Sequence, residues 1–337
     1  MTSIPAAANH RNDQSAGPEP EVERAAAPRL ADQVSVVLLT YNCAHRLSTV
    51  LDRLESLAVT VIAVDNGSSD DTVAVLRERG LRVAALGHNI GAAARNVGVE
   101  LAPTPYVAMC DDDGWYERDG LARAANLLRQ HPRLAVVNGR ILVGPEQRLD
   151  PISAEMEASP LPDPGGVVGT PLLGFMAGAV VVRRSAYLEV GGYDPRFFIG
   201  GEEETLSFRL AKAGWDLRYV PDVVVHHRPS LANVTRLRSH GMRSTLWNAW
   251  LHRRLGSALR WTAFTLADRP KNRDWIVGVT MAVRGLPWVL REREPMTREL
   301  DDRLRLLDRR RFAERRPLWS RRDWQPPADP EPTEASR

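Results

Sequence analysis

Short apolar runs alternate with helical spacings along most of the chain. Residues 34–40 (VSVVLLT) form a continuous, β-branched run that is typical of a strand buried on both faces. Similar runs predict strands at residues 59–64, 81–86, 106–110, 136–143 and 175–182. Apolar positions at helical spacing predict helices at residues 43–57, 69–79, 91–101, 117–130, 184–190 and 202–213. This alternation predicts an α/β fold whose doubly wound, mostly parallel sheet is flanked by helices.

Two further segments complete the predicted domain. Residues 145–170 are rich in Pro, Gly and acidic residues, and we expect a loop there that covers the site. Residues 217–227 predict two short strands on either side of Pro221.

Composition divides the chain into four segments. Residues 1–32 and 324–337 are of low complexity and show no periodicity, so we expect two disordered tails. Residues 33–230 carry the α/β pattern, and residues 231–323 predict a helical extension in which tryptophans alternate with arginines. The tryptophans concerned are Trp247, Trp250, Trp261, Trp275 and Trp288. Packing against the α/β domain is the favoured interpretation of this extension. Contact with an anionic membrane surface, an acceptor-binding subdomain and a dimer interface are left open.

Charge and cysteine content limit the partners and the cellular location that we expect. The formal net charge is +3, and arginines crowd the region after His227. No nucleic-acid-binding motif accompanies them, so we expect no nucleic-acid partner. Two cysteines without a CxxC spacing indicate a reducing compartment, and we expect a cytoplasmic protein. A peripheral position on the inner face of a membrane is left open. The longest apolar stretch, residues 276–290, is interrupted by Arg284 and Pro287, so no transmembrane helix is predicted.

Polar clusters follow three of the predicted strands directly. Thr40, Tyr41 and Asn42 follow the first strand, residues 65–68 follow the second, and residues 111–113 follow the fourth. Right-handed crossovers bring the carboxyl ends of parallel strands to one edge, where open α/β sheets bind ligands. The sequence therefore predicts a ligand site at this edge.

The run Asp111-Asp112-Asp113 offers carboxylates at alternate positions of a strand end, which can share a hard divalent cation on a pyrophosphate. Acidic residues that complement the dipole of the following helix are the equal alternative. Glu202-Glu203-Glu204 opens a predicted helix in the same way, and one of these carboxylates is a candidate general base.

Two other features are weaker on their own. His226 and His227 end a predicted strand and can supply a metal ligand, although such a pair is more often a packing feature. Arg95 and Asn96 can reach a phosphate, and a solvated arginine is the alternative.

Taken in order, these clusters resemble the family-2 glycosyltransferases, which have the GT-A fold and invert the transferred sugar. The matching segments are VSVVLLTYN at 34–42, VDNGSSDDT at 64–72, HNIGAAARNVGVE at 88–100, CDDD at 110–113, GGYDPRFFIGGEEETLSFRLAKAGW at 191–215 and YVPDVVVHH at 219–227. Each segment is weak alone, whereas the ordered set is specific and covers residues 34–230.

The resemblance implies a nucleotide-sugar donor, a divalent cation (Mg²⁺ or Mn²⁺) and an acceptor that is a glycan, a lipid-linked sugar or a small molecule. The residues that it implies for binding the donor are Thr40, Tyr41, Asn42, Asp65, Asn89, Arg95, Asp111 and Asp112. Asp111, Asp113 and His227, or alternatively His226, match positions that contact the metal or the diphosphate. Glu203 matches the catalytic base.

One departure from the family pattern concerns this base. Most members carry Asp at position 203 and an acid two residues later, where this chain has Thr205. Glutamate is longer by one methylene, so either the acceptor lies further away or Glu202 or Glu204 takes the role. A non-catalytic sugar-nucleotide-binding protein and a nucleotidyltransferase are the alternative functions. The latter is disfavoured because Thr40-Tyr41-Asn42 stands where a Gly-rich phosphate loop is expected.

Overall fold

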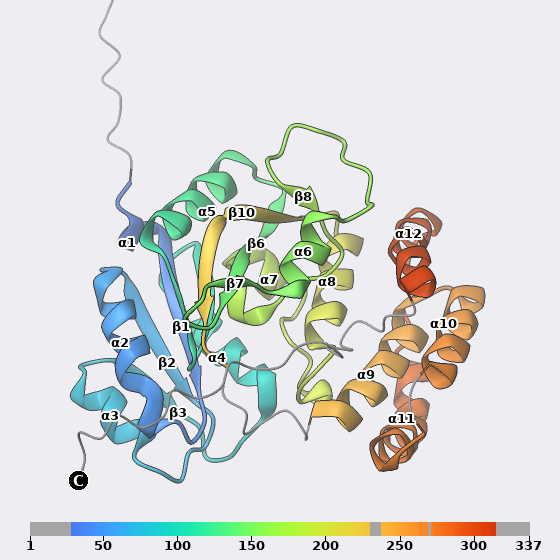
Figure 1. The fold of residues 1–337 in the computed structure, drawn as a ribbon, viewed down its shortest axis with the longest axis horizontal. Coiled ribbons are helices and arrows are strands. Elements are labelled where there is room, and N and C mark those ends of the chain that lie inside the picture. The colour runs from blue at the N-terminus through green and yellow to red at the C-terminus, as the bar shows by residue number, and fades with distance from the viewer. Residues whose placement is uncertain (1–27, 230–236, 269–270, 315–337) are drawn as a thin grey trace, which may run out of the picture.

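The computed structural model describes residues 28–229, 237–268 and 271–314 of the chain (Figure 1). The disordered tails predicted for residues 1–32 and 324–337 lie outside this range, except for residues 28–32, where a short helix α1 (Leu30–Gln33) begins. The α/β domain and the helical extension lie side by side, and helices α9 to α12 form the right-hand part of the molecule in Figure 1.

The sheet of the described residues has ten strands, and six of them (β1, β2, β3, β4, β6 and β10) run in the same direction. Its order is β3-β2-β1-β4-β9-β6-β10-β5, with β7 paired to β6 and β8 paired to β10. The other four strands of this described sheet, β5, β7, β8 and β9, run in the opposite direction. The strands are β1 (Val34–Thr40), β2 (Thr60–Asp65), β3 (Arg82–Ala85), β4 (Tyr106–Asp111), β5 (Gly114–Tyr116), β6 (Leu134–Val143), β7 (Arg148–Leu149), β8 (Thr170–Pro171), β9 (Val180–Arg183) and β10 (Asp216–His227).

Helices cover both faces of this sheet, so the predicted fold class is confirmed. One apolar core joins alternate residues of β1, such as Val36 and Leu38, to α2, α3 and α5. The other core joins Val37 of the same strand to α4, α7 and α8. The helices of this domain are α2 (Leu47–Ser56), α3 (Thr72–Glu78), α4 (Ala94–Leu101), α5 (Arg118–Gln130), α6 (Pro151–Glu157), α7 (Arg184–Glu189) and α8 (Glu202–Lys212). The alternation along β1 is the period of two that a strand imposes.

Three predicted segments differ from the structure. Residues 145–170 are not a bare loop, because they contain β7 and α6, whose first turn is capped by Asp150. The strand predicted at 175–182 begins only at Val180, because residues 177–179 form a 3₁₀ turn. Residues 216–227 form one strand, and a register shift between Val220 and Val224 accommodates Pro221. A bulge is a usual way for a sheet to admit proline.

The extension consists of α9 (Leu237–His252), α10 (Leu255–Ala267), α11 (Arg273–Arg291) and α12 (Arg298–Glu314). It packs on the α/β domain through two apolar clusters. Phe197, which lies shortly before α8, meets Trp247 and Trp288 edge to face. Phe208 of α8 joins Leu300 and Leu304 of α12. The favoured interpretation of the tryptophans, packing toward the domain, therefore holds for Trp247 and Trp288.

Candidate active site

The carboxyl ends of five parallel strands meet at one edge of the sheet, as the sequence predicts. Strands β1, β2, β4, β6 and β10 run in the same direction, because β4 and β6 are both antiparallel to β9. Asp111 ends β4 and His227 ends β10. Residues that are more than a hundred positions apart in the sequence therefore reach the same edge.

Each aspartate of the trio at this edge faces a cationic side chain from a different element. Arg95 of α4 donates to Asp111. Arg46 lies 2.7 Å from a carboxylate oxygen of Asp112. The third partner, His227, is described below. Burial raises the pKa of Asp112 against the opposing charge of Arg46. The three carboxylates therefore share one surface, and basic groups compensate their charge.

A short turn between the two acidic clusters links Asp111 to Glu203. The backbone N–H of Ala177 donates to Glu203 Oε1 at 2.8 Å. The next residue, Gly178, lies so close to Asp111 that an added Cβ would be 2.7 Å from its Oδ2. The turn is held from the other side by Asn138, whose Oδ1 accepts from the N–H of Met176 at 2.7 Å. Asp111 and Glu203 therefore flank adjacent residues of one turn.

Arg95 lies at the centre of this arrangement. Its side chain is 6% exposed. Burial lowers the pKa of Arg95, and the charges of Asp111, Glu202 and Glu203 outweigh that effect and raise it. A single guanidinium thus interacts with both acidic clusters. The sequence-based expectation that Arg95 contacts a phosphate stays a prediction, since in this structure Arg95 is bonded to Asp111.

The local backbone fixes which glutamate faces Asp111. Helix α8 begins after Gly201, whose φ of +98° favours glycine and whose added Cβ would be 2.7 Å from Ser244. Glu204 accepts a hydrogen bond from Asn248 of α9 at 3.0 Å. Glu202 is 5% exposed, and its Oε2 has no hydrogen-bond partner among the described residues. Only Glu203 of the three is bonded to the turn beside Asp111.

Burial raises the pKa of Glu203 to about 8. The charge of Glu202 adds to this rise, and that of Asp111 contributes in the same direction, whereas the Ala177 N–H and Arg95 lower it. A carboxylate with a pKa near the working pH suits a general base, because it accepts a proton readily and is still ionised often enough. The position of Glu203 and its raised pKa suit the predicted role, and its action as a general base stays a prediction.

The departure from the family pattern at this helix has a structural counterpart. Thr205, which stands where most members have an acid, is buried, and its hydroxyl donates to Asn248 of α9. The longer side chain of Glu203 reaches the Ala177 N–H. A residue of the extension, Asn248, therefore contacts the position where most family members carry an acid.

The first two strand ends form one loop network. Thr40 donates from Oγ1 to Asp65 Oδ1 at 3.3 Å, and Asp65 accepts from the N–H of Ser68 at 2.9 Å. Asn42, with φ +49°, donates its N–H to Ser68 Oγ at 2.9 Å. Tyr41 points outward with 42% of its surface exposed. The four residues predicted for the base and ribose pocket are therefore adjacent, and their contact with a donor stays a prediction.

Two asparagines that were grouped with the donor contacts hold the backbone. Asn89 Oδ1 accepts from Asn66 Nδ2 at 3.0 Å and from the N–H of Gly91 at 2.8 Å. Asn96 Nδ2 donates to the carbonyl of Tyr193 at 2.9 Å. These bonds tie the loops after β2 and β3 to each other and α4 to the turn before α8. The donor role of Asn89 remains a prediction.

The two histidines have different surroundings, which answers the question left open between them. His226 stacks on Trp115 with ring centroids 5.3 Å apart and contacts Glu117 and Gln147. His227 Nε2 lies 3.4 Å from Asp113 Oδ1. Burial lowers the pKa of His227, and the Asp113 carboxylate raises it on balance. Of the pair, His227 is the one that faces the aspartates.

The donor set fits a divalent cation that is shared with a phosphate ligand. Asp113 Oδ1 and His227 Nε2, at 3.4 Å, have the spacing of neighbouring ligands on one ion whose bonds are about 2.1 Å long. No group of three or more candidate ligands is clustered within the described residues. Mg²⁺-type sites use one or two carboxylates and complete their shell with water and substrate phosphates. Asp113 and His227 can supply two ligands to such a site, and the part of Asp111 as a metal ligand stays a prediction.

Sequence reasoning missed several residues that shape the site. Arg46 sits on a 3₁₀ turn and gives no local signal of its pairing with Asp112. The Ala177 N–H is a backbone group, which a sequence pattern cannot show. Gly178 is a detectable signal, since a glycine next to a predicted strand often marks a close approach. Asn248 belongs to the extension, outside the segments that resemble the family.

Comparison with known proteins agrees with this geometry. Residues 35–191 match the family described as glycosyl transferase family 2. An N-acetylglucosaminyl-diphospho-decaprenol L-rhamnosyltransferase of Mycobacterium tuberculosis is 28% identical over 281 residues, which cover 69% of this chain and 90% of the relative. A pre-mycofactocin glycosyltransferase of the same organism is 32% identical over 213 residues, covering 58% of this chain and 42% of that protein.

Solved structures show the same fold. A mannosyltransferase from Pyrobaculum calidifontis, solved with GDP-Man and Mn²⁺, has a TM-score of 0.51 at 18% identity and covers 86% of this chain and 90% of its own. Residues 1–349 of S. aureus TarS give a TM-score of 0.54 at 14% identity and cover 85% and 93%.

The sheet and its helices have the GT-A fold of these solved structures. The match of residues 35–191 and the named relatives support a family-2 glycosyltransferase and argue against the nucleotidyltransferase alternative.

Proposed function

We propose that the protein is an inverting glycosyltransferase that uses Glu203 as general base and a divalent cation, Mg²⁺ or Mn²⁺, at Asp111, Asp113 and His227. It transfers a sugar from a nucleotide-sugar donor to an acceptor hydroxyl. The observation that carries this proposal is the turn at residues 177–179. The N–H of Ala177 in this turn donates to Glu203 Oε1, and the next residue, Gly178, lies against Asp111 Oδ2.

The proposed reaction is a single displacement. Glu203 takes the proton of the acceptor hydroxyl while its oxygen forms a bond to the anomeric carbon. The bond from that carbon to the diphosphate oxygen breaks, and its electron pair leaves with the nucleoside diphosphate. Because attack and departure occur on opposite faces, the anomeric configuration inverts. General base catalysis of this kind contributes about 10²–10⁴-fold to the rate.

A bound divalent cation neutralises charge on the departing diphosphate. Arg95 lies between both acidic clusters and keeps the Asp111 carboxylate in place. The turn at Gly178 leaves no room for a side chain beside Asp111, which limits how far that carboxylate can move.

Relatives support the classes of donor and acceptor. The Pyrobaculum enzyme was solved with GDP-Man, which is a nucleotide sugar. The mycobacterial rhamnosyltransferase is named for a lipid-linked acceptor, an N-acetylglucosaminyl-diphospho-decaprenol. Both cysteines, Cys43 and Cys110, are buried free thiols, which supports a reducing, cytoplasmic location.

A donor screen tests the proposal. The full chain is heated with UDP-, GDP- and dTDP-sugars, with Mn²⁺, Mg²⁺ or EDTA, and the melting temperature is followed. We expect one nucleotide class to raise it only when a cation is present. The matched donor is then incubated with a polyprenyl-diphosphate-linked N-acetylglucosamine and with free sugars. Stabilisation by no donor, or stabilisation that EDTA leaves unchanged, contradicts the proposal.

The stereochemistry is tested on the product. NMR of the anomeric proton compares the configuration of the transferred sugar with that in the donor. Inversion is expected, and a retained configuration contradicts single displacement with Glu203 as base.

A further inference from the structure

Helix α11 carries large apolar side chains on its outer face, the reverse of a helix on the surface of a soluble domain. Ile276, Val283 and Leu290 recur every seven residues and are 57%, 61% and 48% exposed. Thr280 and Pro287 lie on the same row between them. This apolar row extends for roughly 21 Å along the helix.

The fully buried positions of the same helix are Gly278, Ala282, Gly285 and Val289, and Trp275, Val279 and Trp288 pack beside them. An added Cβ at Gly278 would lie 2.6 Å from the Cβ of Met242 in α9, and one at Gly285 would overlap the ring of Trp247. Close contact with α9 is thus made by the small residues together with side chains such as Trp288 on the same side of the helix. The large side chains on the outside are not required to attach α11 to the protein.

Arginines line one side of the apolar row. Arg273, Arg284 and Arg291 lie roughly 60–80° around the helix from it at 100° per residue. Arg273 and Arg284 form no ion pair with another described residue, whereas Arg291 contacts Glu292 at 3.2 Å. The single acid within α11, Asp274, falls on the packed side. The exposed face of α11 is therefore apolar and basic.

We propose that α11 is a membrane-surface helix. Its apolar row enters the boundary between headgroups and acyl chains, and Arg273 and Arg284 bind the phosphates of anionic lipids. Within the part of the chain that the structure describes, no helix is long and apolar enough to cross a bilayer, so contact is parallel to the surface. A second copy fits the charges less well, since its arginines would find no acidic row to pair with.

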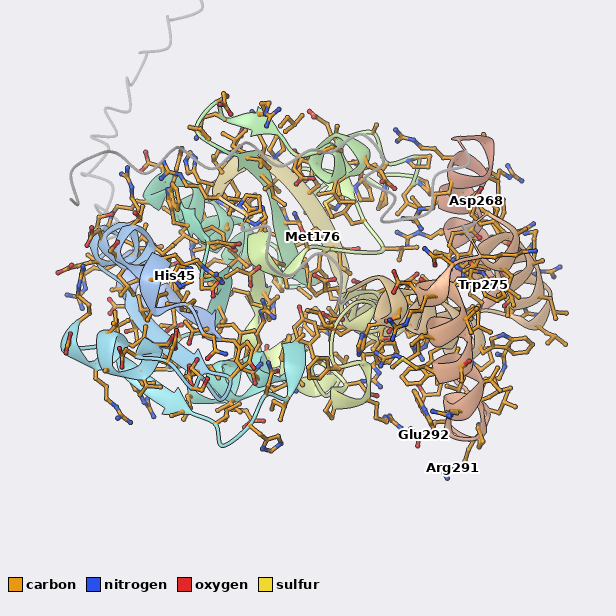
Figure 2. All side chains as sticks on the ribbon, turned by 60° about the horizontal axis from the view of Figure 1, so that its bottom comes forward. His45, Met176, Asp268, Trp275, Arg291 and Glu292 are labelled. Atoms are coloured by element: carbon orange, nitrogen blue, oxygen red, sulfur yellow. The ribbon has the colours of Figure 1, made fainter. Side chains whose placement is uncertain are left out.

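The position of α11 gives this contact a consequence for the site. Figure 2 shows Trp275 and Arg291 toward the two ends of α11, on the side of the molecule away from His45. Helix α11 packs on α9, and Asn248 of α9 holds Glu204 and the carbonyl of Gly201. A docked α11 would thus fix the helix that begins at the proposed base relative to the membrane. The docking surface itself does not depend on the role of Glu203.

Sedimentation of the full chain with lipid vesicles tests the proposal. The vesicles contain equal parts of phosphatidylglycerol and phosphatidylcholine, or phosphatidylcholine alone, with no glycosyl acceptor. We expect the chain to sediment with the anionic vesicles and much less with the neutral ones. Val283→Asp should lower the partition coefficient about tenfold, and Ile276→Asp with Val283→Asp about 100-fold. The matched control Val168→Asp, at a residue that is 50% exposed in the α/β domain, should leave binding unchanged.

A second pair of variants separates the charge from the apolar row. Arg273→Gln with Arg284→Gln should weaken binding to the anionic vesicles about 25-fold. Arg77→Gln with Arg129→Gln carries the same change of net charge on exposed positions elsewhere and should have no effect. Circular dichroism confirms that each variant is folded. The proposal is overturned if the unmodified chain does not bind anionic vesicles, or if Val283→Asp behaves like Val168→Asp. A dimer in sedimentation velocity that Val283→Asp dissociates, with no vesicle binding, would overturn it in favour of a second copy.

Discussion

The two acidic clusters of the site consist of the same kind of side chain in opposite surroundings. Asp111, Asp112 and Asp113 end a strand, and each faces a basic group from another element. Glu202, Glu203 and Glu204 begin a helix beneath the extension, and burial raises the pKa of all three. Under the proposed mechanism the compensated aspartates would exchange a basic partner for a cation and diphosphate, whereas burial favours the protonated form of the glutamates. The comparison suggests that the surroundings of a carboxylate, not its residue type, set its proposed role.

The largest expected effect comes from removing the proposed base. Glu203→Gln should lower kcat by about 10²–10⁴-fold, because the amide cannot accept the acceptor proton. Donor affinity measured by calorimetry with Mn²⁺ should stay unchanged. Glu78→Gln, on an exposed position of α3, is the control and should leave both quantities as they are. Full activity in Glu203→Gln would remove the distinction between the clusters.

Removing a carboxylate of the aspartate cluster should lower the affinity for the donor. Asp113→Asn removes a carboxylate that faces His227, and we expect donor affinity in the presence of Mn²⁺ to fall by about 10–100-fold. Calorimetry with and without Mn²⁺ measures this. The same donor affinity as in the unmodified chain, with only turnover lost, would mean that Asp113 does not hold the cation.

The glutamate cluster should also make stability depend on pH. The pKa of Glu203 is raised from its model-compound value of 4.5 to about 8 in the folded chain. The folded state therefore holds an extra proton between these values, and the stability linked to it is complete below pH 4.5 and lost as the pH rises through about 8. Glu203→Gln cannot lose that proton, so it should be more stable than the unmodified chain at pH 9 by on the order of 2 kcal/mol. Equal melting temperatures at pH 6 and pH 9 would contradict the raised pKa.

The hydrogen bonds from Asn248 of the extension to the start of α8 should contribute to the stability of the glutamate cluster. Asn248→Ala leaves Glu204, the carbonyl of Gly201 and Thr205 without their partner. Unfolding in urea should show a loss of about 1–3 kcal/mol. Asn126→Ala, on an exposed position of α5, is the control and should cost far less. An equal, small cost for both would show that α9 does not support the glutamate cluster.

The smallest expected effect distinguishes the two main causes of the raised pKa of Glu203, which are burial and the charge of Glu202. The profile of kcat/KM against pH should rise to a plateau above about pH 8, since it reports the free base. Glu202→Gln removes the second cause of the raised pKa, so the rising limb should move to lower pH. The limb should not reach the ordinary range of a glutamate, because burial is the larger cause. An unmoved limb would exclude Glu202 as an influence on the base.

Much of the sheet edge follows from the sequence alone. Residues 34–40 are buried and β-branched, and the predicted strand coincides with β1. Clusters directly after β1, β2 and β4 reach one edge because parallel strands leave no other arrangement. The choice of His227 over His226 does not follow in this way, because it depends on Trp115 and Asp113 from two other segments. The raised pKa of Glu203 likewise depends on burial in the folded chain and on the charges of Asp111 and Arg95 from other segments, which the local pattern of α8 does not show.

A crystal structure of Glu203→Gln with Mn²⁺ and its donor tests most directly whether both clusters act on one substrate. We predict that the cation will lie on Asp113 and His227, with the diphosphate against it and the anomeric carbon facing the side chain at position 203. A donor bound elsewhere, or a side chain at 203 that faces away from the sugar, would contradict this assignment of roles.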